Sequence, residues 1–347
     1  MTSHPDFGHA TKASEVADTF ASQIKGRVVV VTGVSRGGLG GATALAFARQ
    51  NPSLLILVSR TQSKLDDVIS DIRAANPSLP AAAVTSVLVD LTSQATVRRA
   101  AADIKALTTR IDVLVNNAGF FLEQRTYSPE GIESQLAGNH IGPFLLTNLL
   151  RDELVAAAAA DGKKEAGATR VVSLTSEGHR VQPFRFHDHN IEGKPVPAEE
   201  EMRPMPDAMP KALVEPRDGY VGFSAYGQSK TANVLFTVGL NERVLKGTGV
   251  VAYVVHPGTI FTEVGRSVES QDALDSFLGA LNPKASTDEG AATTMVAALD
   301  PALKDVKSAS SIYLDDCQLK DAEPYAVDVE IADRLWKFSE ELVKQTF

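Results

Sequence analysis

The chain reads Val28-Val29-Val30-Val31-Thr32-Gly33-Val34-Ser35-Arg36-Gly37-Gly38-Leu39-Gly40 before a helical run from Ala42 to Arg49. Four consecutive valines are typical of a strand that is covered on both faces, because a half-exposed strand alternates apolar and polar residues. Glycines between a first strand and a first helix let the backbone approach a pyrophosphate, which then lies at the positive end of the helix dipole. Many turns contain glycines, but this position predicts a dinucleotide-binding turn.

Apolar runs of the same kind recur along the chain and alternate with helical patterns. Leu65, Val68 and Ile72 fall at the i, i+3 and i+7 spacing of one helix face. Further strands are predicted at Leu54–Val58, Val84–Val89, Val113–Val115, Val171–Leu174, Val250–Val255 and Ser311–Leu314. Strands that alternate with helices predict right-handed βαβ units. We therefore expect an α/β fold, a single doubly wound Rossmann-type domain with a seven-stranded parallel sheet over residues 26–347.

The composition narrows the class of protein. Of the 347 residues 44% are hydrophobic and 22% are charged, which is close to the average for globular domains. The net charge is −9 and no run of five Lys or Arg residues occurs, which argues against a nucleic-acid partner. The one cysteine, Cys317, excludes an internal disulfide and a multi-cysteine metal site. We expect a cytoplasmic protein without a bound metal.

Residues 1–25 precede the first strand as an N-terminal extension. They lack the basic start and the apolar core of a secretory signal, and they lack the roughly 20 apolar residues of a membrane anchor. We expect a partly ordered cap on the fold and no contact with a membrane.

Residues 180–222 interrupt the alternation of strands and helices with a proline-rich insertion. This segment contains seven of the 17 prolines, namely Pro183, Pro195, Pro197, Pro204, Pro206, Pro210 and Pro216. Prolines at this density forbid a regular helix or a central strand. A long irregular insertion inside a compact domain is usually a functional lid or a disordered loop. We expect a substrate lid, with a disordered loop as the alternative.

The residues after the second predicted strand bear on the form of the cofactor. An NAD site places Asp or Glu about 20 residues after the glycines, where the carboxylate binds the ribose 2′-hydroxyl. This chain has Ser59-Arg60-Thr61 there instead, and Arg36 lies within the glycine turn. Guanidinium groups suit a 2′-phosphate, because they form bidentate, charge-assisted hydrogen bonds. The sequence therefore predicts NADP(H).

Tyr226 and Lys230 stand four residues apart, so a helix would place them on one face. A tyrosine with a pKa near 10 becomes a useful base at neutral pH only if its pKa falls by about three units. Such a fall requires the phenolate to be stabilised by roughly 4 kcal/mol relative to the phenol. An ammonium at about 4 Å supplies about that much at an effective dielectric constant near 20. The pair thus predicts an acid–base group, and the alternative is a pair on a helix surface without such a shift.

Five motifs occur in one order along the chain: Thr32-Gly33…Gly38-Leu39-Gly40, Asn116-Asn117-Ala118-Gly119, Ser176, Tyr226…Lys230 and His256-Pro257-Gly258. Together they resemble the short-chain dehydrogenase/reductase family over residues 26–299. The finer patterns Asn139–Thr147 and Ala225–Asn233 are similar to the branch that contains retinol dehydrogenases and WW-domain oxidoreductases.

The resemblance implies roles for four catalytic residues. Tyr226 would exchange a proton with the substrate oxygen, and Lys230 would lower the pKa of Tyr226 and bind the nicotinamide ribose. Ser176 would hold the substrate oxygen. Asn139 would kink its helix and support a water that leads protons from Lys230 to solvent.

The glycine turn, the second strand and the resemblance together imply the cofactor contacts. The expected residues are Gly33, Ser35, Arg36, Gly38, Leu39, Gly40, Ser59, Arg60, Asp90, Leu91, Asn116, Asn117, Ala118, Gly119, Tyr226, Lys230, Pro257, Gly258 and Thr262. Among them, Asp90 and Leu91 would flank the adenine, and Thr262 would help to hold the nicotinamide amide and the phosphates.

The chain departs from the family pattern in three places. Gly33 and Gly38 enclose four residues rather than three, so either the turn has one extra residue, which we favour, or Gly37 takes the second glycine's role. Thr175 precedes Ser176 where the family has a second serine, which makes Thr175 a minor rival for the catalytic hydroxyl. The 50-residue spacing from Ser176 to Tyr226 reflects the insertion.

The resemblance predicts an NADP(H)-dependent oxidoreductase that interconverts a ketone or aldehyde with an alcohol. The proline-rich lid suggests a bulky or hydrophobic substrate, and the long insertion would suit a specialised biosynthetic ketoreductase as well as a broad carbonyl reductase. The protein would be a monomer or a homodimer, and the insertion would favour the monomer by analogy with monomeric carbonyl reductases. Two alternatives remain: a catalytically idle NADP(H)-binding regulatory protein, and an epimerase or dehydratase of the same family.

Two histidine-containing segments have open roles. His179 would either touch the substrate or lie at the surface, and His187-Asp188-His189 would be solvated rather than bind a metal.

Overall fold

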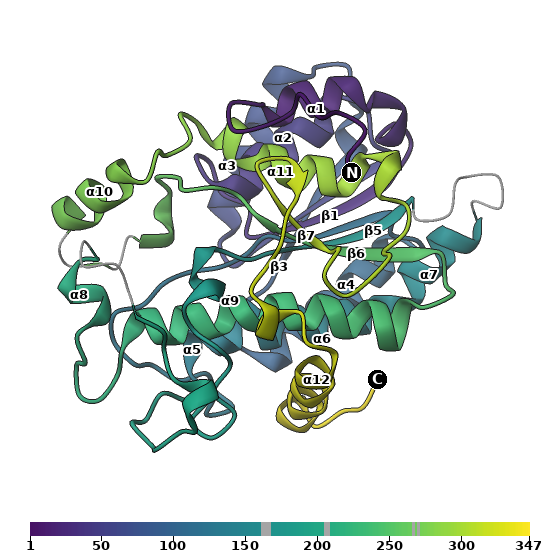
Figure 1. The fold of residues 1–347 in the computed structure, drawn as a ribbon. Coiled ribbons are helices and arrows are strands. Elements are labelled where there is room, and N and C mark those ends of the chain that lie inside the picture. The colour runs from purple at the N-terminus through teal and green to yellow at the C-terminus, as the bar shows by residue number, and fades with distance from the viewer. Residues whose placement is uncertain (161–167, 205–208, 266–267, 269–270) are drawn as a thin grey trace.

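Helices cover both faces of one central sheet (Figure 1). The computed structural model describes residues 1–160, 168–204, 209–265, 268 and 271–347. In these residues the sheet has the strand order β3-β2-β1-β4-β5-β6-β7-β8. The strands are β1 (Val28–Thr32), β2 (Leu54–Ser59), β3 (Val84–Leu88), β4 (Val113–Asn116), β5 (Thr169–Leu174), β6 (Val250–His256), β7 (Tyr313–Asp315) and β8 (Gln318–Leu319). The expected doubly wound α/β fold is confirmed.

The sheet has one strand more than the sequence predicts. Strands β1 to β7 pair in parallel, whereas β8 pairs antiparallel with β7. The two residues of the connecting turn, Asp316 and Cys317, have φ angles of 47° and 64°. Positive φ at both positions is the geometry of a tight hairpin, which usually contains Gly or Asn. Because Asp-Cys is not a common hairpin pair, the sequence gives no sign of β8.

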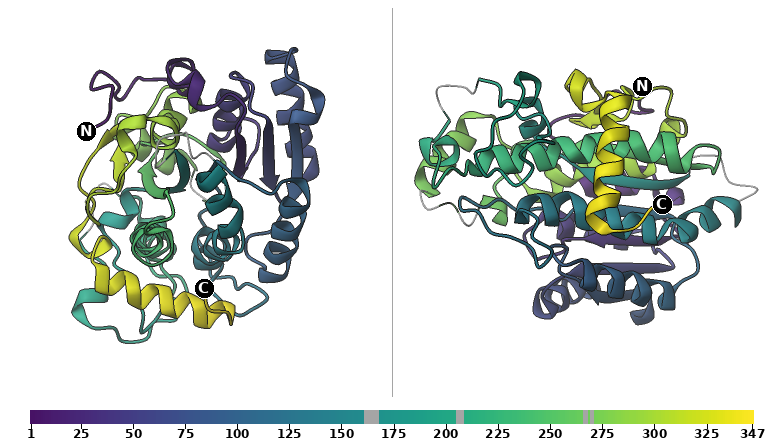
Figure 2. Two further views of the ribbon diagram at one scale, coloured as in Figure 1. Left: turned by 90° about the vertical axis from the view of Figure 1, so that its right-hand side faces the viewer. Right: turned by 90° about the horizontal axis from the view of Figure 1, so that it is seen from below.

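The helices form one layer on each side of the sheet (Figures 1 and 2). The described helices are α1 (Ala13–Thr19), α2 (Leu39–Ala48), α3 (Gln62–Ala75), α4 (Gln94–Leu107), α5 (Ser134–Leu136), α6 (Gly142–Leu149), α7 (Arg151–Ala160), α8 (Lys211–Val214), α9 (Gly222–Gly239), α10 (Gln271–Ala280), α11 (Thr287–Leu299) and α12 (Val329–Val343). Helices α1, α2, α3 and α11 build one apolar core with the sheet, and α4, α6, α9 and α12 build the other.

The valines of β1 show why that strand is apolar throughout. Val29 and Val31 belong to the core beneath α2 and α11, and Val30 belongs to the core beneath α4 and α6. All three side chains are fully buried. Successive side chains of a strand point to opposite faces, so a strand covered on both faces has no position for a polar residue.

The N-terminal segment is more than a partly ordered cap. Helix α1 packs against α2 and α11, and Val16 and Phe20 are buried in the same core as β1. The backbone N–H and the hydroxyl of Ser14 both donate to the Asp288 carboxylate of α11, at 3.0 and 2.7 Å. Residues 1–25 therefore complete one of the two cores.

The proline-rich insertion winds around a buried carboxylate. Asp188 accepts hydrogen bonds from the backbone N–H groups of Glu192, Gly193 and Lys194, at 2.8, 3.0 and 3.2 Å, and it pairs with Arg185. The expectation that Asp188 is solvated is wrong, because these donors satisfy it inside the loop. Residues 205–208 of the insertion lie outside the described residues.

Candidate active site

A cavity of about 530 Å³ lies where the strand order reverses, between β1 and β4. In open parallel sheets this switch point, at the carboxyl ends of the strands, is the usual position of a ligand. Many of the expected cofactor residues line the cavity, namely Gly33, Ser35, Gly38, Leu39, Ser59, Arg60, Asp90, Leu91, Asn117, Ala118, Gly119 and Thr262. Most of the residues expected to contact the cofactor therefore lie around one cavity, although they come from five separate segments of the sequence.

The glycine turn fits tightly between β1 and α2. Gly33 has a φ angle of 71°, and a Cβ there would lie 2.5 Å from the Cα of Ala118. A Cβ at Gly40 would lie 2.5 Å from the Gly33 carbonyl oxygen. Gly38 is the N-cap of α2 and has no side chain to close the helix end, so backbone N–H groups face the turn. This packing favours the alternative in which the turn has one extra residue and ends in Gly38-Leu39-Gly40.

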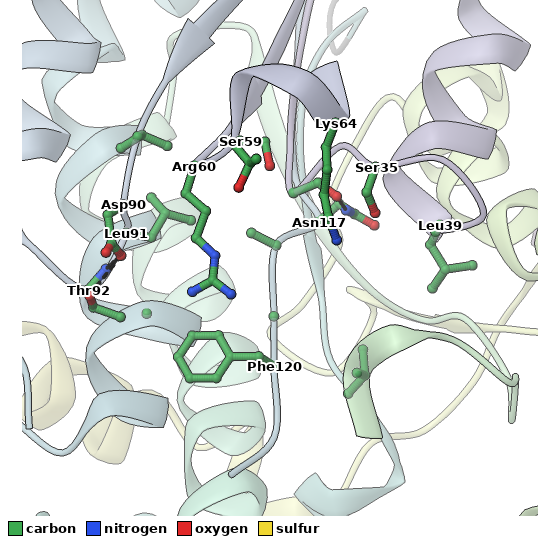
Figure 3. A pocket seen from close by; sticks show the side chains of 18 of the residues that line it. Ser35, Leu39, Ser59, Arg60, Lys64, Asp90, Leu91, Thr92, Asn117 and Phe120 are labelled. Atoms are coloured by element: carbon green, nitrogen blue, oxygen red, sulfur yellow. Dashed lines mark hydrogen bonds between the residues drawn. The ribbon is translucent and has the colours of Figure 1, made fainter. Parts of the chain in front are cut away.

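Two basic side chains enter the cavity from the region after β2. Arg60 and Lys64 both line it, and Figure 3 shows both side chains directed inward from the segment that begins α3. Lys64 is a lining residue that is not among the cofactor contacts expected from the sequence. Its position in the first turn of α3, shortly after Arg60, could have revealed it, because the start of this helix lies at the same edge of the sheet as the end of β2.

Arg36 lies elsewhere, although the sequence predicts that it contacts the cofactor. Its guanidinium forms two hydrogen bonds of 2.7 Å with the carboxylate of Asp71 and an ion pair of 3.4 Å with Asp67. Its side chain is 54% exposed, and it is not among the residues that line the cavity. Two carboxylates one turn apart on α3 bind the guanidinium more directly than the cavity does.

Asn116 does not line the cavity, whereas Asn117 lines it and is also hydrogen-bonded to β1. Asn116 donates a hydrogen bond to Thr147, and Asn117 donates to the carbonyl of Thr32, which ties β4 to β1. Pro257 and Gly258 are not among the lining residues. A Cβ at Gly258 would lie 2.5 Å from the Cε of Lys284, so this turn rests on the buried lysine side chain.

Ser176, Tyr226 and Lys230 gather at the edge of the cavity. Ser176 directly follows β5 and is the N-cap of a single 3₁₀ turn, η4 (Glu177–Arg180). Its hydroxyl lies close enough to the hydroxyl of Tyr226, which comes from α9, to act on the pKa of that tyrosine. The Nζ atom of Lys230 lies 5.5 Å from the centre of the Tyr226 ring, and a Cβ on the lining residue Gly119 would be 2.9 Å from it. Three segments far apart in the sequence thus meet at the cofactor cavity.

Thr175, the alternative candidate for the catalytic hydroxyl, has a different hydrogen-bond partner. The hydroxyl of Thr175 donates a hydrogen bond of 2.8 Å to the backbone carbonyl of Lys230, and Thr175 is buried. Ser176 alone of the two directs its hydroxyl toward Tyr226.

Asn139 lies in an irregular stretch of helix. Helix α5 continues through a π-helical segment, η3 (Ala137–Ile141), into α6, and π-helical turns often mark functional sites. The amide of Asn139 accepts a hydrogen bond from Phe120 N–H and donates to Phe120 C=O, each at 3.0 Å, and it also donates to Ser229. The side chain therefore fixes the loop that carries Gly119 and Phe120 against α9.

The pKa of Tyr226 differs from the expectation. Burial raises the pKa of its hydroxyl above 10.0, and the hydrogen bond with Ser176 acts in the opposite direction. Burial also lowers the pKa of Lys230 to about 8. The predicted lowering of the tyrosine pKa is absent because the loss of solvation outweighs the opposing effect of Ser176.

Apolar side chains pack against the Tyr226 ring. Phe121, Leu213 of α8 and Val268 are buried in a cluster that also includes Phe223 and Tyr226. The ring centres of Phe121 and Tyr226 are 5.8 Å apart. Helices α8 and α10 lie at the same end of the molecule (Figure 1), and Leu274 of α10 joins this cluster. We call these residues the Phe121 cluster.

Two further features concern metals and membranes. No group of three or more His, Cys, Asp or Glu side chains in the described ranges is arranged to hold a metal ion. None of the helices in the described part of the chain has the length and apolar character needed to cross a membrane.

Comparison with known proteins identifies the family. The sequence profile of the family described as short chain dehydrogenase matches residues 27–184. Oxidoreductase fscI from Fusarium equiseti is 36% identical over 255 residues, which cover 73% of this chain and 94% of that protein. Retinol dehydrogenase 12 from Mus musculus is 32% identical over 324 residues, which cover 92% of this chain and 87% of that protein.

The fold agrees with these matches. The crystal structure of an uncharacterized protein from Mycobacterium paratuberculosis superimposes with a TM-score of 0.62 at 27% identity, over 93% of this chain and 96% of that one. With the doubly wound sheet, the cavity at its switch point and the sequence relatives in agreement, the chain belongs to the short-chain dehydrogenase/reductase family of oxidoreductases, in the branch of the retinol dehydrogenases.

Proposed function

We propose that this protein is an NADP(H)-dependent oxidoreductase that reduces a ketone or an aldehyde to an alcohol, or catalyses the reverse reaction. One observation carries the proposal: the Ser176 and Tyr226 hydroxyls lie together, and the Lys230 ammonium lies 5.5 Å from the centre of the Tyr226 ring and next to Gly119, a wall residue of the cofactor cavity. Hydroxyl and ammonium groups beside a nicotinamide site are suited to exchange a proton with a substrate oxygen.

The residues present fit a dinucleotide. The cavity volume of about 530 Å³ lies in the range of cofactor sites. Gly33 allows the glycine turn to pack against Ala118 of the cavity wall, and the N-terminus of α2 faces the turn, as a pyrophosphate requires. When bound, the nicotinamide cofactor supplies or accepts the hydride, and the protein orients it.

The chain's own groups would handle the proton. Tyr226 donates its hydroxyl proton to the substrate oxygen in reduction and removes it in oxidation. The raised pKa of Tyr226 keeps this hydroxyl protonated at neutral pH, which suits the reductive direction. Ser176 donates a hydrogen bond to the same oxygen. Lys230, with a pKa lowered to about 8, can replace the proton, and Asn139 holds the adjoining loop.

Arg60 and Lys64 support the choice of NADP(H). Both side chains line the cavity at the end of β2, where an NAD site has a carboxylate. Two cations attract the dianionic 2′-phosphate, and Ser59 adds a hydroxyl donor.

The Phe121 cluster supports a bulky or hydrophobic substrate. Its apolar side chains surround the ring of Tyr226, so the group attached to the reacting carbonyl would contact Phe121, Leu213 and Phe223. The insertion contributes Leu213, which supports its role as a substrate lid.

A monomer is the assembly that the packing supports. Helix α12 lies across α9 (Figure 2), and the Trp336 ring packs against Gly239. Phe184 and Phe186 of the insertion pack against Phe338 of α12. These segments of the chain cover the outer side of α9, which leaves less apolar surface for a second copy. Sedimentation velocity at micromolar concentration should show a single species of monomer mass.

A panel of ketones and aldehydes with purified protein and NADPH tests the activity. The proposal requires NADPH oxidation with at least one carbonyl, faster than with NADH. Tight NADPH binding without turnover on any substrate would favour the regulatory protein instead. Conversion of a substrate without net change in NADPH would favour an epimerase or a dehydratase.

A further inference from the structure

His179 occupies neither of the positions that the sequence left open. It is fully buried, so it is not a surface residue, and it is not among the residues that line the cavity. It stands three residues after Ser176, in the 3₁₀ turn η4. A buried histidine next to a catalytic hydroxyl, with no contact to the cofactor cavity, requires another explanation.

The imidazole is bound to the backbone of Ser176. The carbonyl oxygen of Ser176 accepts two hydrogen bonds from His179, one from the backbone N–H at 3.1 Å and one from Nδ1 at 2.6 Å. A carbonyl oxygen only accepts, so Nδ1 carries the proton and the tautomer is fixed. Burial lowers the pKa of His179 to about 4, so the ring is neutral at pH 7. Nε2 has no hydrogen-bond partner among the described residues.

The backbone of His179 is bound to two other segments. Its carbonyl oxygen accepts a hydrogen bond of 2.6 Å from the hydroxyl of Tyr325 and a longer one of 3.4 Å from Thr231. Thr231 directly follows Lys230 on α9. His179 thus joins the turn that carries Ser176 to the helix that carries Tyr226 and Lys230.

Within the turn, the backbone conformation and one hydrogen bond place the serine hydroxyl. Ser176 has an extended backbone, with φ −155° and ψ 172°, and η4 is a single turn. The hydroxyl of Ser176 accepts a hydrogen bond of 3.0 Å from the Gly178 N–H. A side chain at Gly178 would place its Cβ 3.0 Å from this hydroxyl and 3.2 Å from the Cα of Gly227. The position of the hydroxyl therefore depends on how the peptide group after Ser176 is held.

We propose that His179 is a positioning residue for Ser176: its Nδ1–H holds the Ser176 carbonyl and thereby keeps the serine hydroxyl beside the Tyr226 hydroxyl. The proposal rests on the proposed function, in which Ser176 binds the substrate oxygen. Without the imidazole, the peptide group after Ser176 can rotate and the hydroxyl can move away from the reacting oxygen. Displacement of a catalytic group by about 1 Å can reduce the rate about 100-fold.

Three substitutions at this position separate positioning from packing. His179→Leu fills similar space without a donor, and we expect kcat to fall about 10- to 100-fold with the Kd for NADPH unchanged. His179→Asn places an amide N–H where Nδ1 was, and it should recover most of kcat. His179→Gln places its amide one atom farther out, and it should remain as slow as the leucine variant.

Two controls define the mechanism. Arg180→Met removes the ion pairs of the same turn with Glu177 and Glu323 but leaves the Ser176 carbonyl bonded, so its kcat should stay within about twofold of the wild type. In a Ser176→Ala background, His179→Leu should have almost no additional effect on kcat, because its target is already gone.

The outcomes separate the two proposals. Equal kcat for the wild type and His179→Leu overturns the role of His179, and so does a loss that is as large in the Ser176→Ala background. If His179→Leu does not fold, as judged by NADPH binding, the Asn and Gln variants decide, and equal rates for these two overturn the role. A wild-type protein without turnover on the carbonyl panel contradicts the proposed function instead.

Discussion

The Nζ atom of Lys230 lies 5.5 Å from the centre of the Tyr226 ring, one turn farther along α9. Lys230 is buried and also donates to the carbonyl of Leu174 at 3.3 Å. Both ionisable groups have shifted pKa values in the directions that burial favours: the phenol more firmly protonated and the ammonium more readily neutral. The fold therefore favours a protonated hydroxyl on Tyr226 over a phenolate.

Replacement of Tyr226 by Phe should remove this proton donor. We expect kcat for carbonyl reduction to fall by about 10²- to 10⁴-fold, the usual contribution of an acid–base group, while the Kd for NADPH changes less than about twofold. Steady-state kinetics and NADPH fluorescence measure the two quantities. Tyr253→Phe is a matched control, because the Tyr253 hydroxyl is buried and bound to the Leu303 carbonyl. A Tyr226→Phe enzyme as fast as this control would refute the assignment.

The buried ammonium of Lys230 should make the stability of the fold depend on pH. Lys230 loses its proton near pH 8 in the folded chain, and its ordinary value is 10.5. The unfolded chain therefore binds more protons between these values, and the free energy of unfolding should rise with pH across this window. Below pH 8 the buried charge costs about 3 kcal/mol.

Lys230→Met isolates this effect. At pH 7 the variant should be more stable than the wild type without cofactor, and the difference should shrink between pH 8 and pH 10.5. Urea unfolding at several pH values measures it. A constant difference across the window would show that Lys230 keeps an ordinary pKa.

The cations of the cavity should determine the choice between NADPH and NADH. Arg60→Asp removes a charge-assisted hydrogen bond and adds a repulsive charge, so the Kd for NADPH should rise at least about tenfold while NADH binds as well or better. Lys64→Met should weaken NADPH binding to a smaller extent. Arg36→Ser is the contrasting variant, because Arg36 pairs with Asp71, and its NADPH affinity should barely change. Equal losses at Arg60 and Arg36 would contradict the cavity geometry.

The Phe121 cluster should govern substrate choice. Phe121→Ala removes apolar contact beside Tyr226, and burial of a phenylalanine side chain contributes about 1.5–3 kcal/mol. We expect KM for bulky hydrophobic carbonyls to rise about tenfold or more, with little change for a small aldehyde that does not reach the cluster. Parallel rises for both substrates would place the bulky group elsewhere.

The sequence predicts the parts of this protein that depend on local pattern. The valine run of β1, the glycine turn and the Tyr226…Lys230 spacing each contain the information that places them, because a strand, a turn and a helix face are set by neighbouring residues. The strand order then brings Ser176 from β5 to the same cavity.

Local sequence patterns do not predict features that depend on competition between distant groups. Arg36 is bound by Asp67 and Asp71, which lie 31 and 35 residues farther along the chain, and no local pattern reports that pairing. The tyrosine pKa was wrong in direction because desolvation depends on the whole surrounding fold. Nothing in the sequence around His179 shows that its ring turns back onto the Ser176 carbonyl.

The docking of the first 25 residues affects how this protein can be produced. Helix α1 packs against α11. The His9 carbonyl accepts a hydrogen bond from the amine of Lys284, and the turn at Gly258 packs against the Lys284 side chain. A chain shortened to begin at β1 would expose the apolar core surface that Val16 and Phe20 cover, and Lys284 would lose its hydrogen bond to the His9 carbonyl. The truncated protein should aggregate during purification, and expression trials should therefore retain residues 1–25.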